Sequence, residues 1–447
     1  MKSEVLTVSS LALLYAIRML GLFMVLPVLF IYGRDYANAS PVALGLALGA
    51  YGLTQAVFQI PLGLLSDFWG RKTVIVLGLL VFAVGSVVAA MSDSVFGLII
   101  GRALQGSGAI ASTIMALVAD LTSDKNRTKA MAAIGASIGL SFMVAMVLGP
   151  ILAAFAGLSG IFIVAALLAL VGIVIVTVLV PTPAPSVHSH RDSGAIPSLM
   201  WRIFTSGELA RLNVGIFVLH AVLTAMFVAV PTMLVSEAGV QESAHWQVYL
   251  PVLLVSFITA LPIMIIAEKK ARGKEAFIAA VAVLVIVFSG LASLPLVTAL
   301  LPLMFLFFLA FNLLEAMLPS LVSKLAPAGG KGTAMGIYST AQFLGAFTGG
   351  ALGGVVIAHF GASSLFAFCG VLSFLWLMVA AFMARPLNLA SVCFPVTSDA
   401  ADLDLVSEKG VADAIYVEED GMLYLKVDKK KIDFAQLDAL LKPYSLP

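Results

Sequence analysis

Twelve apolar stretches of about 20 residues recur along this 447-residue chain, and each is long enough to cross roughly 30 Å of hydrocarbon as a helix. Hydrophobic residues make up 61% of the sequence and charged residues 11%, whereas soluble domains carry roughly 25% charged residues. The sequence therefore predicts an all-α membrane protein with twelve transmembrane helices. The predicted spans are 8–32, 42–65, 73–91, 96–120, 130–155, 159–181, 212–235, 246–267, 275–294, 298–323, 332–358 and 363–384.

The lysines and arginines of the short loops predict how these spans are oriented. Sixteen of them lie on one side of the predicted membrane part, and Arg34 alone lies on the other. Cytoplasmic loops carry the excess of basic residues in membrane proteins. We therefore expect both termini in the cytoplasm and the chain as a multi-pass protein of a bacterial inner membrane. The first span lacks a small-residue cleavage site, so we do not interpret it as a signal peptide.

The longest connection, residues 182–211, separates six spans from six. The segment that begins at Arg127 resembles the segment that begins at Lys331, 204 residues later, as expected for two related six-helix halves. The sequence predicts an N-terminal bundle at 1–181, a cytoplasmic linker with an amphipathic segment at 182–211, and a C-terminal bundle at 212–385.

Glycines spaced four residues apart predict places where helices approach closely. Glycine is common in spanning helices, and that alone explains about half of these pairs. The spaced glycines are Gly45 and Gly49, Gly97 and Gly101, Gly135 and Gly139, and Gly345, Gly349 and Gly353.

The tail, residues 386–447, differs from the rest because it holds 17 of the 49 charged side chains. Its pattern predicts strands at 391–396, 411–417 and 421–427 and helices at 398–409 and 432–441. That order predicts a small soluble α+β domain of ferredoxin-like topology with its final strand short or missing. Its run of three lysines, residues 429–431, is either a solvated face or a contact to anionic lipid, and a regulatory partner is the other interpretation of the tail.

Several function classes are excluded by composition and motifs. The net charge is +1 and the basic residues are spread over short loops, which argues against a nucleic-acid partner. Cys369 and Cys393 are the two cysteines of the chain, too few for a cysteine metal site. The sequence has no Walker-type run and no cluster of nucleophile, metal or cofactor ligands. We therefore predict no enzyme, no metal and no cofactor, with energy taken from a proton gradient.

The predicted loop between the second and third spans holds Gly63, Asp67, Gly70, Arg71 and Lys72. Gly63 allows close approach of a neighbouring helix, and Gly70 permits a tight turn. Asp67 and Arg71 are spaced to form a charge pair. Such a pair would latch two helices together at the membrane surface.

This loop resembles the signature loop of the major facilitator superfamily, although Phe68 stands where many members have arginine. In that superfamily an acid at the end of the fourth span joins the loop network, and the resemblance implies this role for Asp120. It also implies that Asp67 faces the start of the eleventh span, near residues 332–335, where free amide donors favour an anion. Breaking that contact would accompany a conformational switch, a role that the resemblance implies for the loop residues and Asp120 together.

The fourth span carries Arg102 and Gln105 in an apolar segment. An arginine inside a span costs about 2.5–3.5 kcal/mol on insertion scales, so we expect a compensating role. In the superfamily the matching arginine lies in the proton or substrate path. The fifth span contains Gly149 and Pro150, similar to the superfamily's antiporter motif with alanines in place of several glycines, which predicts a helix bend and favours export over uptake.

Other polar side chains fall inside predicted spans, where each is costly in lipid and is expected to face the interior. They are Arg18, Gln55, Gln59, His220, Asn312, Glu315 and Gln342. The residues that we assign to the proton or substrate path are Arg18, Arg102, Gln105, His220, Asn312 and Glu315. Interhelical hydrogen bonding is the other interpretation of the glutamines and of Asn312. Glu315 is the first choice as proton carrier and His220 the second, with a hydrogen-bonded packing role as the alternative for each.

The chain as a whole is similar to the drug:proton antiporters of the major facilitator superfamily, and in particular to the YajR group of bacterial transporters, which has a C-terminal ferredoxin-like domain. The segments from Arg18 to Pro27, from Tyr51 to Pro61 and from Phe311 to Glu315 carry this resemblance. It implies proton-coupled export of a small lipophilic compound by alternating access. Proton-coupled uptake and a membrane sensor with a signalling tail remain the alternatives.

Overall fold

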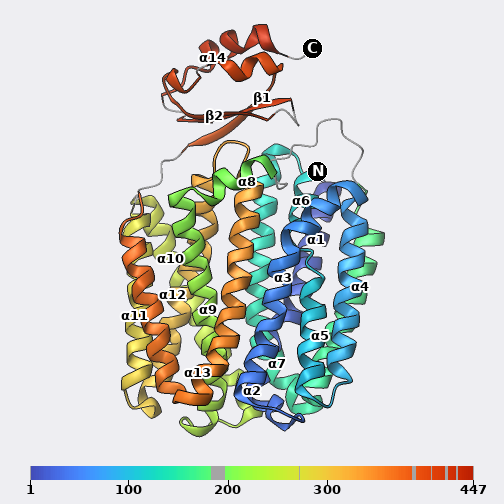
Figure 1. The fold of residues 1–447 in the computed structure, drawn as a ribbon, viewed down its shortest axis with the longest axis vertical. Helices are drawn as coiled ribbons and strands as arrows, with labels where there is room; N and C mark the ends of the chain where they lie inside the picture. Colours follow the sequence, from blue (N-terminus) through green and yellow to red (C-terminus); the bar gives the residue numbers. More distant parts are fainter. Residues whose placement is uncertain are drawn as a thin grey trace.

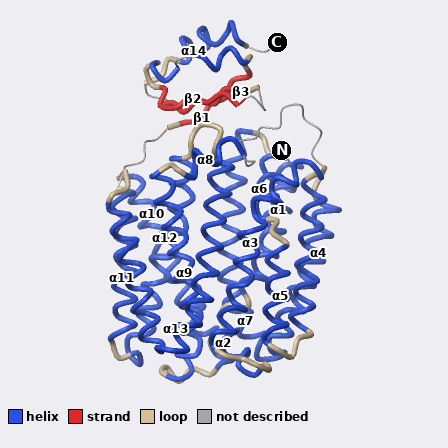
Figure 2. Tube along the Cα trace, viewed as in Figure 1, coloured by secondary structure: helices blue, strands red, loops and turns tan. Residues whose placement is uncertain are grey.

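The computed structural model describes residues 2–182, 197–270, 272–384, 389–403, 405–417, 421–428 and 431–445. Most of the predicted linker, residues 183–196, and two of the tail lysines, Lys429 and Lys430, lie outside the described residues. Long helices run side by side, and a small sheet domain lies beyond one end of them (Figure 1, Figure 2). We call that end the tail end, and the opposite end, where α2 (Leu29–Tyr32) lies, the far end.

The helices form two halves, drawn from blue to cyan and from green to orange in Figure 1. The first half comprises α1 (Lys2–Phe23), α2, η1 (Gly33–Asp35), α3 (Pro41–Trp69), α4 (Arg71–Ala90), α5 (Val95–Ser107), α6 (Ala111–Asp120), α7 (Asp124–Val174) and η2 (Ile175–Leu179), a π-helical continuation of α7. The short helix α8 (Pro197–Phe204) precedes the second half. The second half comprises α9 (Gly207–Ser236), η4 (Glu242–Ala244), α10 (Trp246–Lys269), α11 (Gly273–Ser293), α12 (Leu296–Leu325) and α13 (Lys331–Ala381).

Ten helical segments of the described chain are long and apolar enough to cross a membrane. Two of them, α7 and α13, have 51 residues each and leave helical geometry once, at Gly157 and at Gly361. Each of these helices therefore provides two crossings. With α5 and α6 counted as one span, the described helices give the twelve predicted crossings, and the predicted all-α membrane fold is confirmed.

Two predicted spans are interrupted, which the apolar pattern did not indicate. The first helix ends at Phe23 and the chain turns through residues 24–28 before α2, because Pro27 has no amide hydrogen and its ring would clash with the carbonyl four residues earlier. The fourth span breaks between α5 and α6. There the chain turns at Gly108, which packs so tightly against α4 that an added Cβ would overlap the Gly78 carbonyl oxygen.

Glycine contacts bring α13 against α3 and α9. A Cβ at Gly45 of α3 would overlap the Gly350 carbonyl oxygen, and a Cβ at Gly349 would overlap the carbonyl oxygen of Ala221 in α9. These backbones therefore approach closely, as the spacing predicts. The prediction is wrong for Gly135 and Gly139 of α7, because nothing lies within 4 Å of the position a Cβ would take at either residue.

The apolar interior is divided unevenly between the two halves. One cluster joins the second half to the far-end part of the first half, including Leu29, Leu44 and Phe162. A separate cluster holds the tail-end part of the first half, including Leu14 and Leu79. At the far end an ion pair of 2.9 Å between Arg34 and Glu242 also joins the halves. The two halves thus share a continuous core toward the far end, whereas the first half keeps its own core toward the tail end.

The tail folds as a three-stranded antiparallel sheet of order β1-β3-β2, with strands β1 (Ala390–Pro395), β2 (Val411–Val417) and β3 (Met422–Val427). Helix α14 (Phe434–Leu441) covers one sheet face, and η7 (Lys442–Tyr444) follows it. The predicted helix over 398–409 is wrong, because η5 (Ser398–Asp402) and η6 (Leu405–Ser407) are short 3-10 turns there. Serine and aspartate side chains compete for local backbone hydrogen bonds, which disfavours an α-helix.

The other face of the sheet rests on the tail end of the second half. Asp413 of β2 forms an ion pair of 3.1 Å with Arg202 of α8 and accepts a hydrogen bond of 3.1 Å from the amide of Ala328, in the loop before α13. The ring of Tyr424 packs beside Gly329 of the same loop and is 3% exposed. The sheet therefore contacts α8 and the turn that starts α13.

Candidate functional site

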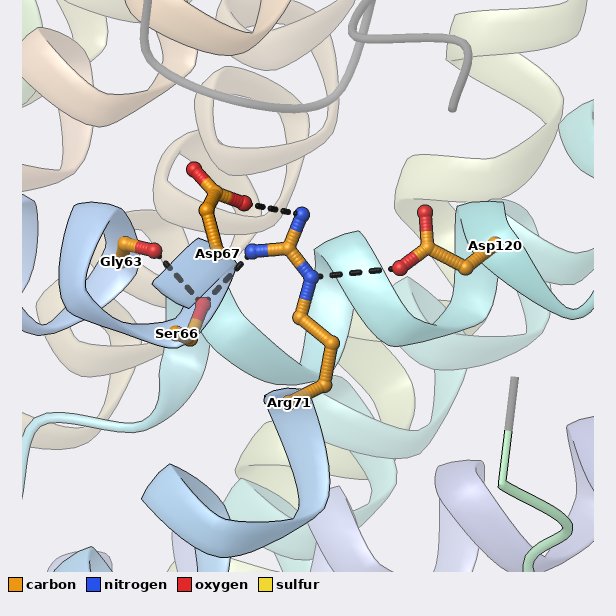
Figure 3. A network of polar contacts seen from close by, with 5 residues as sticks. All are labelled: Gly63, Ser66, Asp67, Arg71 and Asp120. Atoms are coloured by element: carbon orange, nitrogen blue, oxygen red, sulfur yellow. Dashed lines mark hydrogen bonds and ion pairs between the residues drawn. The ribbon is translucent and has the colours of Figure 1, made fainter. Parts of the chain in front are cut away.

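A charge network at the tail end is centred on Arg71, the first residue of α4 (Figure 3). Its Nη2 lies 2.5 Å from Asp67 Oδ1, and its Nε lies 3.2 Å from Asp120 Oδ2. Its Nη1 donates to the Ser66 hydroxyl at 2.6 Å, and that hydroxyl donates to the Gly63 carbonyl at 2.6 Å. One guanidinium thus joins the ends of α3 and α6 to the start of α4.

The network is partly shielded from water, since the side chains of Arg71, Asp120 and Asp67 are 12%, 18% and 33% exposed. Hydrogen bonds between charged groups are stronger than those between neutral groups, and the forked guanidinium has enough donors for all three partners. Ser66 is a member that the sequence analysis missed. Its position one helical turn after Gly63 was the available signal.

The other predicted residues of this loop lie around Arg71. Gly70 has a φ of +87°, a conformation that other residues rarely adopt, and it makes the turn between α3 and α4. Lys72 donates to the Val180 carbonyl at 2.8 Å, just beyond the end of η2, where a cation meets the negative end of a helix. Gly63 faces α6, because an added Cβ would lie 3.0 Å from the Ser112 hydroxyl. The approach of Asp67 to the start of α13 stays a prediction.

A second polar cluster lies within the second half and joins α9, α12 and α13. Gln342 Nε2 lies 2.8 Å from His220 Nε2 and 3.3 Å from Glu315 Oε1. His220 Nδ1 lies 3.3 Å from the Ile216 carbonyl, which assigns the imidazole hydrogen to Nδ1. His220 Nε2 is then the acceptor, so the two amide hydrogens of Gln342 bridge a neutral imidazole and a carboxylate.

This cluster retains unused hydrogen-bonding capacity. His220 Nε2 and Glu315 Oε2 are 3.9 Å apart, and the buried Oε2 atom has no hydrogen-bond partner among the described residues. The hydroxyl of Tyr338 on α13 is also buried without one. Asn312 does not join the cluster, because it donates to Ser256 of α10 at 3.1 Å. Sequence reasoning had identified Gln342 as an interhelical residue but had not placed it between the two predicted proton carriers, His220 and Glu315.

A third cluster lies inside the first half, where Arg18 of α1 and Arg102 of α5 are both buried. Arg18 Nη2 donates to the carbonyls of Gln105 at 3.4 Å and Gly108 at 3.2 Å. Arg102 Nη1 donates to Gln105 Oε1 at 2.9 Å, and Gln105 Nε2 donates to Ser86 of α4 at 2.7 Å. The structure thus brings together Arg18, Arg102 and Gln105.

On α3 the polar side chains continue this cluster. Tyr51 donates to Gln55 Oε1 at 3.0 Å, and Gln55 Nε2 donates to Gln59 Oε1 at 2.8 Å. Sequence reasoning missed Tyr51, since a tyrosine in an apolar span is unremarkable by composition. The ring of Tyr51 contacts Phe343 of α13, next to Gln342, so the clusters of the two halves lie on facing helices.

The pair Gly149 and Pro150 lies within α7. A Cβ at Gly149 would lie 2.5 Å from the Met24 carbonyl oxygen, so this glycine lets α7 approach the interrupted end of α1. The bend at Pro150 stays a prediction. Among the described residues, no group of three or more histidine, cysteine, aspartate or glutamate side chains is placed to hold a metal ion.

Comparison with known proteins places this geometry in context. Residues 11–350 match the family model of the Major Facilitator Superfamily. The inner membrane transport protein YajR of Escherichia coli K12 is 44% identical over 439 residues, covering 96% of this chain and 95% of that protein. The class B tetracycline resistance protein of Escherichia coli is 33% identical over 141 residues, 31% of this chain and 34% of that protein. The solved nucleoside transporter NupG shares the fold, with a TM-score of 0.69 at 14% identity over 84% of this chain and 99% of that one.

Proposed function

This chain belongs to the major facilitator superfamily and is a transporter of the YajR type, and from that premise we propose that it is a proton-coupled antiporter that exports a small lipophilic compound. The observation that carries the proposal is the bridge from Gln342 to His220 and Glu315. Groups that bind protons cost free energy in an apolar span, and a pair of them joined by one amide is suited to exchange a proton.

The bridge supports a switch because its hydrogen bonds require His220 Nε2 to be unprotonated. A proton arriving at His220 Nε2 occupies the lone pair that accepts from Gln342, so the amide must turn away. The new N–H then faces Glu315 Oε2, 3.9 Å away and without a partner among the described residues. Protonation would therefore replace contacts between α9, α12 and α13 by a different set, which alternating access requires.

The uneven core supports rocking of the two halves. With the predicted orientation, the far end faces the periplasm and the tail end the cytoplasm. The shared core at the far end then corresponds to a state closed to the periplasm. The Arg71 network would act at the cytoplasmic surface, where it holds α3, α4 and α6 in one arrangement while the halves move.

Accessibility from the two membrane faces tests transport without knowledge of the cargo. Gln342→Cys is placed in a background with Cys369→Ser and Cys393→Ser, and sealed vesicles of both orientations are treated with an impermeant thiol reagent. We expect labelling from both faces, because alternating access exposes the site to each in turn. Arg34→Cys, at the far end, is the control and should react from one face. Labelling of residue 342 from a single face would favour the sensor instead.

Proton coupling and direction are tested in everted vesicles with a pH-sensitive dye and a panel of lipophilic compounds that begins with tetracycline. An antiporter alkalinises the lumen as the compound enters, whereas a symporter acidifies it. Glu315→Gln should abolish the pH response and leave the protein folded. A pH response that persists in Glu315→Gln removes this residue as the proton carrier.

A further inference from the structure

Two buried guanidinium groups contact the same tyrosine ring inside the first half, and neither has a carboxylate partner among the described residues. Arg18 is 4% exposed and Arg102 is 1% exposed. The Arg18 Cζ lies 5.3 Å and the Arg102 Cζ 4.9 Å from the centre of the Tyr51 ring, and Arg18 also lies 4.1 Å from the centre of the Phe82 ring. Both charges are therefore held against aromatic rings and neutral oxygens.

The hydrogen-bond donors of the pair exceed the acceptors that reach them. Each acceptor that the described residues offer is neutral. Arg18 donates to Gln55 Oε1 at 3.4 Å and to the carbonyls of Gln105 and Gly108, and Arg102 donates to Gln105 Oε1. Three buried nitrogens, Arg18 Nε, Arg18 Nη1 and Arg102 Nε, have no partner among the described residues. A buried, unpaired donor on a charged group is costly.

The acids of the first half are too peripheral to balance these charges. Asp67 and Asp120 bind Arg71, and Glu4 accepts from Ser123 in the loop before α7. The acidic residues whose surroundings are described lie at helix ends or in loops, and they are Glu4, Asp35, Asp67, Asp93 and Asp120. The interior of this half therefore carries two positive charges that its own described side chains leave unpaired.

A crevice whose empty space totals about 200 Å³ adjoins Arg18, and as it stands it has no room for a water-sized group. Arg18, Tyr51 and Gln55 supply its polar wall, and Tyr15, Met19 and Ile114 are among its apolar residues. It is narrow, so an entering group must displace a side chain. Ala111, the first residue of α6, also lines it, and no side chain caps that helix. The free amides at the start of a ten-residue helix add to the positive potential.

From this arrangement we propose that the first half binds the carboxylate of an organic anion, with the guanidinium groups of Arg18 and Arg102 as its ligands and an apolar body of the ligand in the crevice. Binding of the anion is argued from the geometry of the site. Its identification as the transported compound rests on the proposed transport function. The carboxylate supplies the acceptor that the three free nitrogens lack. Its charge also offsets that of the pair, so binding would compensate a cost that the empty site carries.

Equilibrium binding of radiolabelled benzoate to the full-length protein in nanodiscs tests the site. We expect saturable binding that unlabelled benzoate displaces and benzamide, its neutral analogue, does not. Arg18→Gln and Arg102→Gln should each raise the Kd at least tenfold. Arg34→Gln, which changes an exposed arginine at the far end, should leave the Kd unchanged.

A substitute variant and defined negative outcomes complete the experiment. If gel filtration shows that a glutamine variant is misfolded, Arg18→Lys replaces it. Lysine keeps the positive charge but lacks the forked guanidinium, so we expect a severalfold weaker but measurable affinity for benzoate. Absence of saturable benzoate binding, equal displacement by benzamide or by chloride, or unchanged affinity in a folded Arg18→Gln protein would each overturn the proposal. Benzoate binding is measured without a proton gradient, so loss of binding is a failure of this site, whereas benzoate binding without a pH response in everted vesicles is a failure of proton coupling.

Discussion

Tyr51 of α3 and Phe343 of α13 meet edge to face across the boundary between the two halves, with ring centroids 6.3 Å apart and planes inclined by 65°. Tyr51 also donates to Gln55 and lies against both buried arginines, and Phe343 follows Gln342 in the chain. This ring contact is therefore a direct physical link between the arginine cluster of one half and the cluster of His220, Glu315 and Gln342 in the other.

The ring contact should appear as a coupling energy. We expect Tyr51→Ala and Phe343→Ala to destabilise the protein non-additively, with a coupling of about 0.5–1.5 kcal/mol in a double-mutant cycle of thermal unfolding. Tyr51→Phe keeps the ring and removes the hydroxyl, so it should retain the coupling. Phe360→Ala, at a ring that is 71% exposed, provides the uncoupled control. Strict additivity of Tyr51→Ala and Phe343→Ala would show that the link carries no energy.

The glycine contacts predict a difference between two chemically identical changes. Gly349→Ala should lower the free energy of unfolding by about 1–3 kcal/mol, because its Cβ overlaps the Ala221 carbonyl oxygen and α9 and α13 must separate. Gly135→Ala meets nothing within 4 Å and should be neutral or stabilising by about 0.4–1 kcal/mol. Thermal unfolding of both variants in one detergent makes the comparison. Equal effects would contradict the packing described for α13.

The Arg71 network should depend on the forked guanidinium as well as on its charge. Arg71→Lys keeps one positive charge but cannot contact Asp67, Ser66 and Asp120 together, so we expect faster hydrogen exchange at the end of α6 and reduced transport. Lys270→Ala, at an exposed lysine of another tail-end loop, is the matched control. Normal exchange in Arg71→Lys would mean that charge alone maintains the network.

Docking of the tail should depend on Asp413 more than on Arg202. Removing Arg202 leaves Asp413 its bond from the Ala328 amide, and a partly exposed ion pair contributes only about 0–1 kcal/mol. Asp413→Ala removes both contacts and should increase hydrogen exchange at residues 326–330 and in β3. Asp438→Asn, on the exposed side of α14, should leave that exchange unchanged. A larger effect from Arg202→Gln than from Asp413→Ala would contradict the geometry.

Local charge spacing and segment length were readable from the sequence, whereas partners across helices were not. Asp67 and Arg71 are four positions apart in the chain, across the turn at Gly70, and their pairing was predicted and is present. His220 and Glu315 lie on different helices 95 positions apart in the chain, and their polarity indicated burial but not that Gln342 joins them. Asn312 is likewise a polar residue inside an apolar span, but it forms its hydrogen bond with Ser256 and not with this cluster.

The positions where the first and fourth spans break could not be located from the apolar pattern of the sequence. In a span that is apolar on all sides, hydrophobic periodicity carries no information about where the helix stops. Pro27 was a visible local signal at the first break, whereas the turn at Gly108 depends on the close approach of α4, a tertiary contact. The open surroundings of Gly135 likewise depend on how the halves pack.

The tail sheet contacts Ala328 and Gly329, in the loop that directly precedes the start of α13 at Lys331. Helix α13 then runs past Phe343 and Gly350, where it packs against the first half. One helix, α13, therefore connects the tail domain to the boundary between the two halves. A molecule that binds the sheet and tilts it would therefore displace α13 along its contact with the first half. Occupancy of the tail domain would then change how the two halves are arranged at rest.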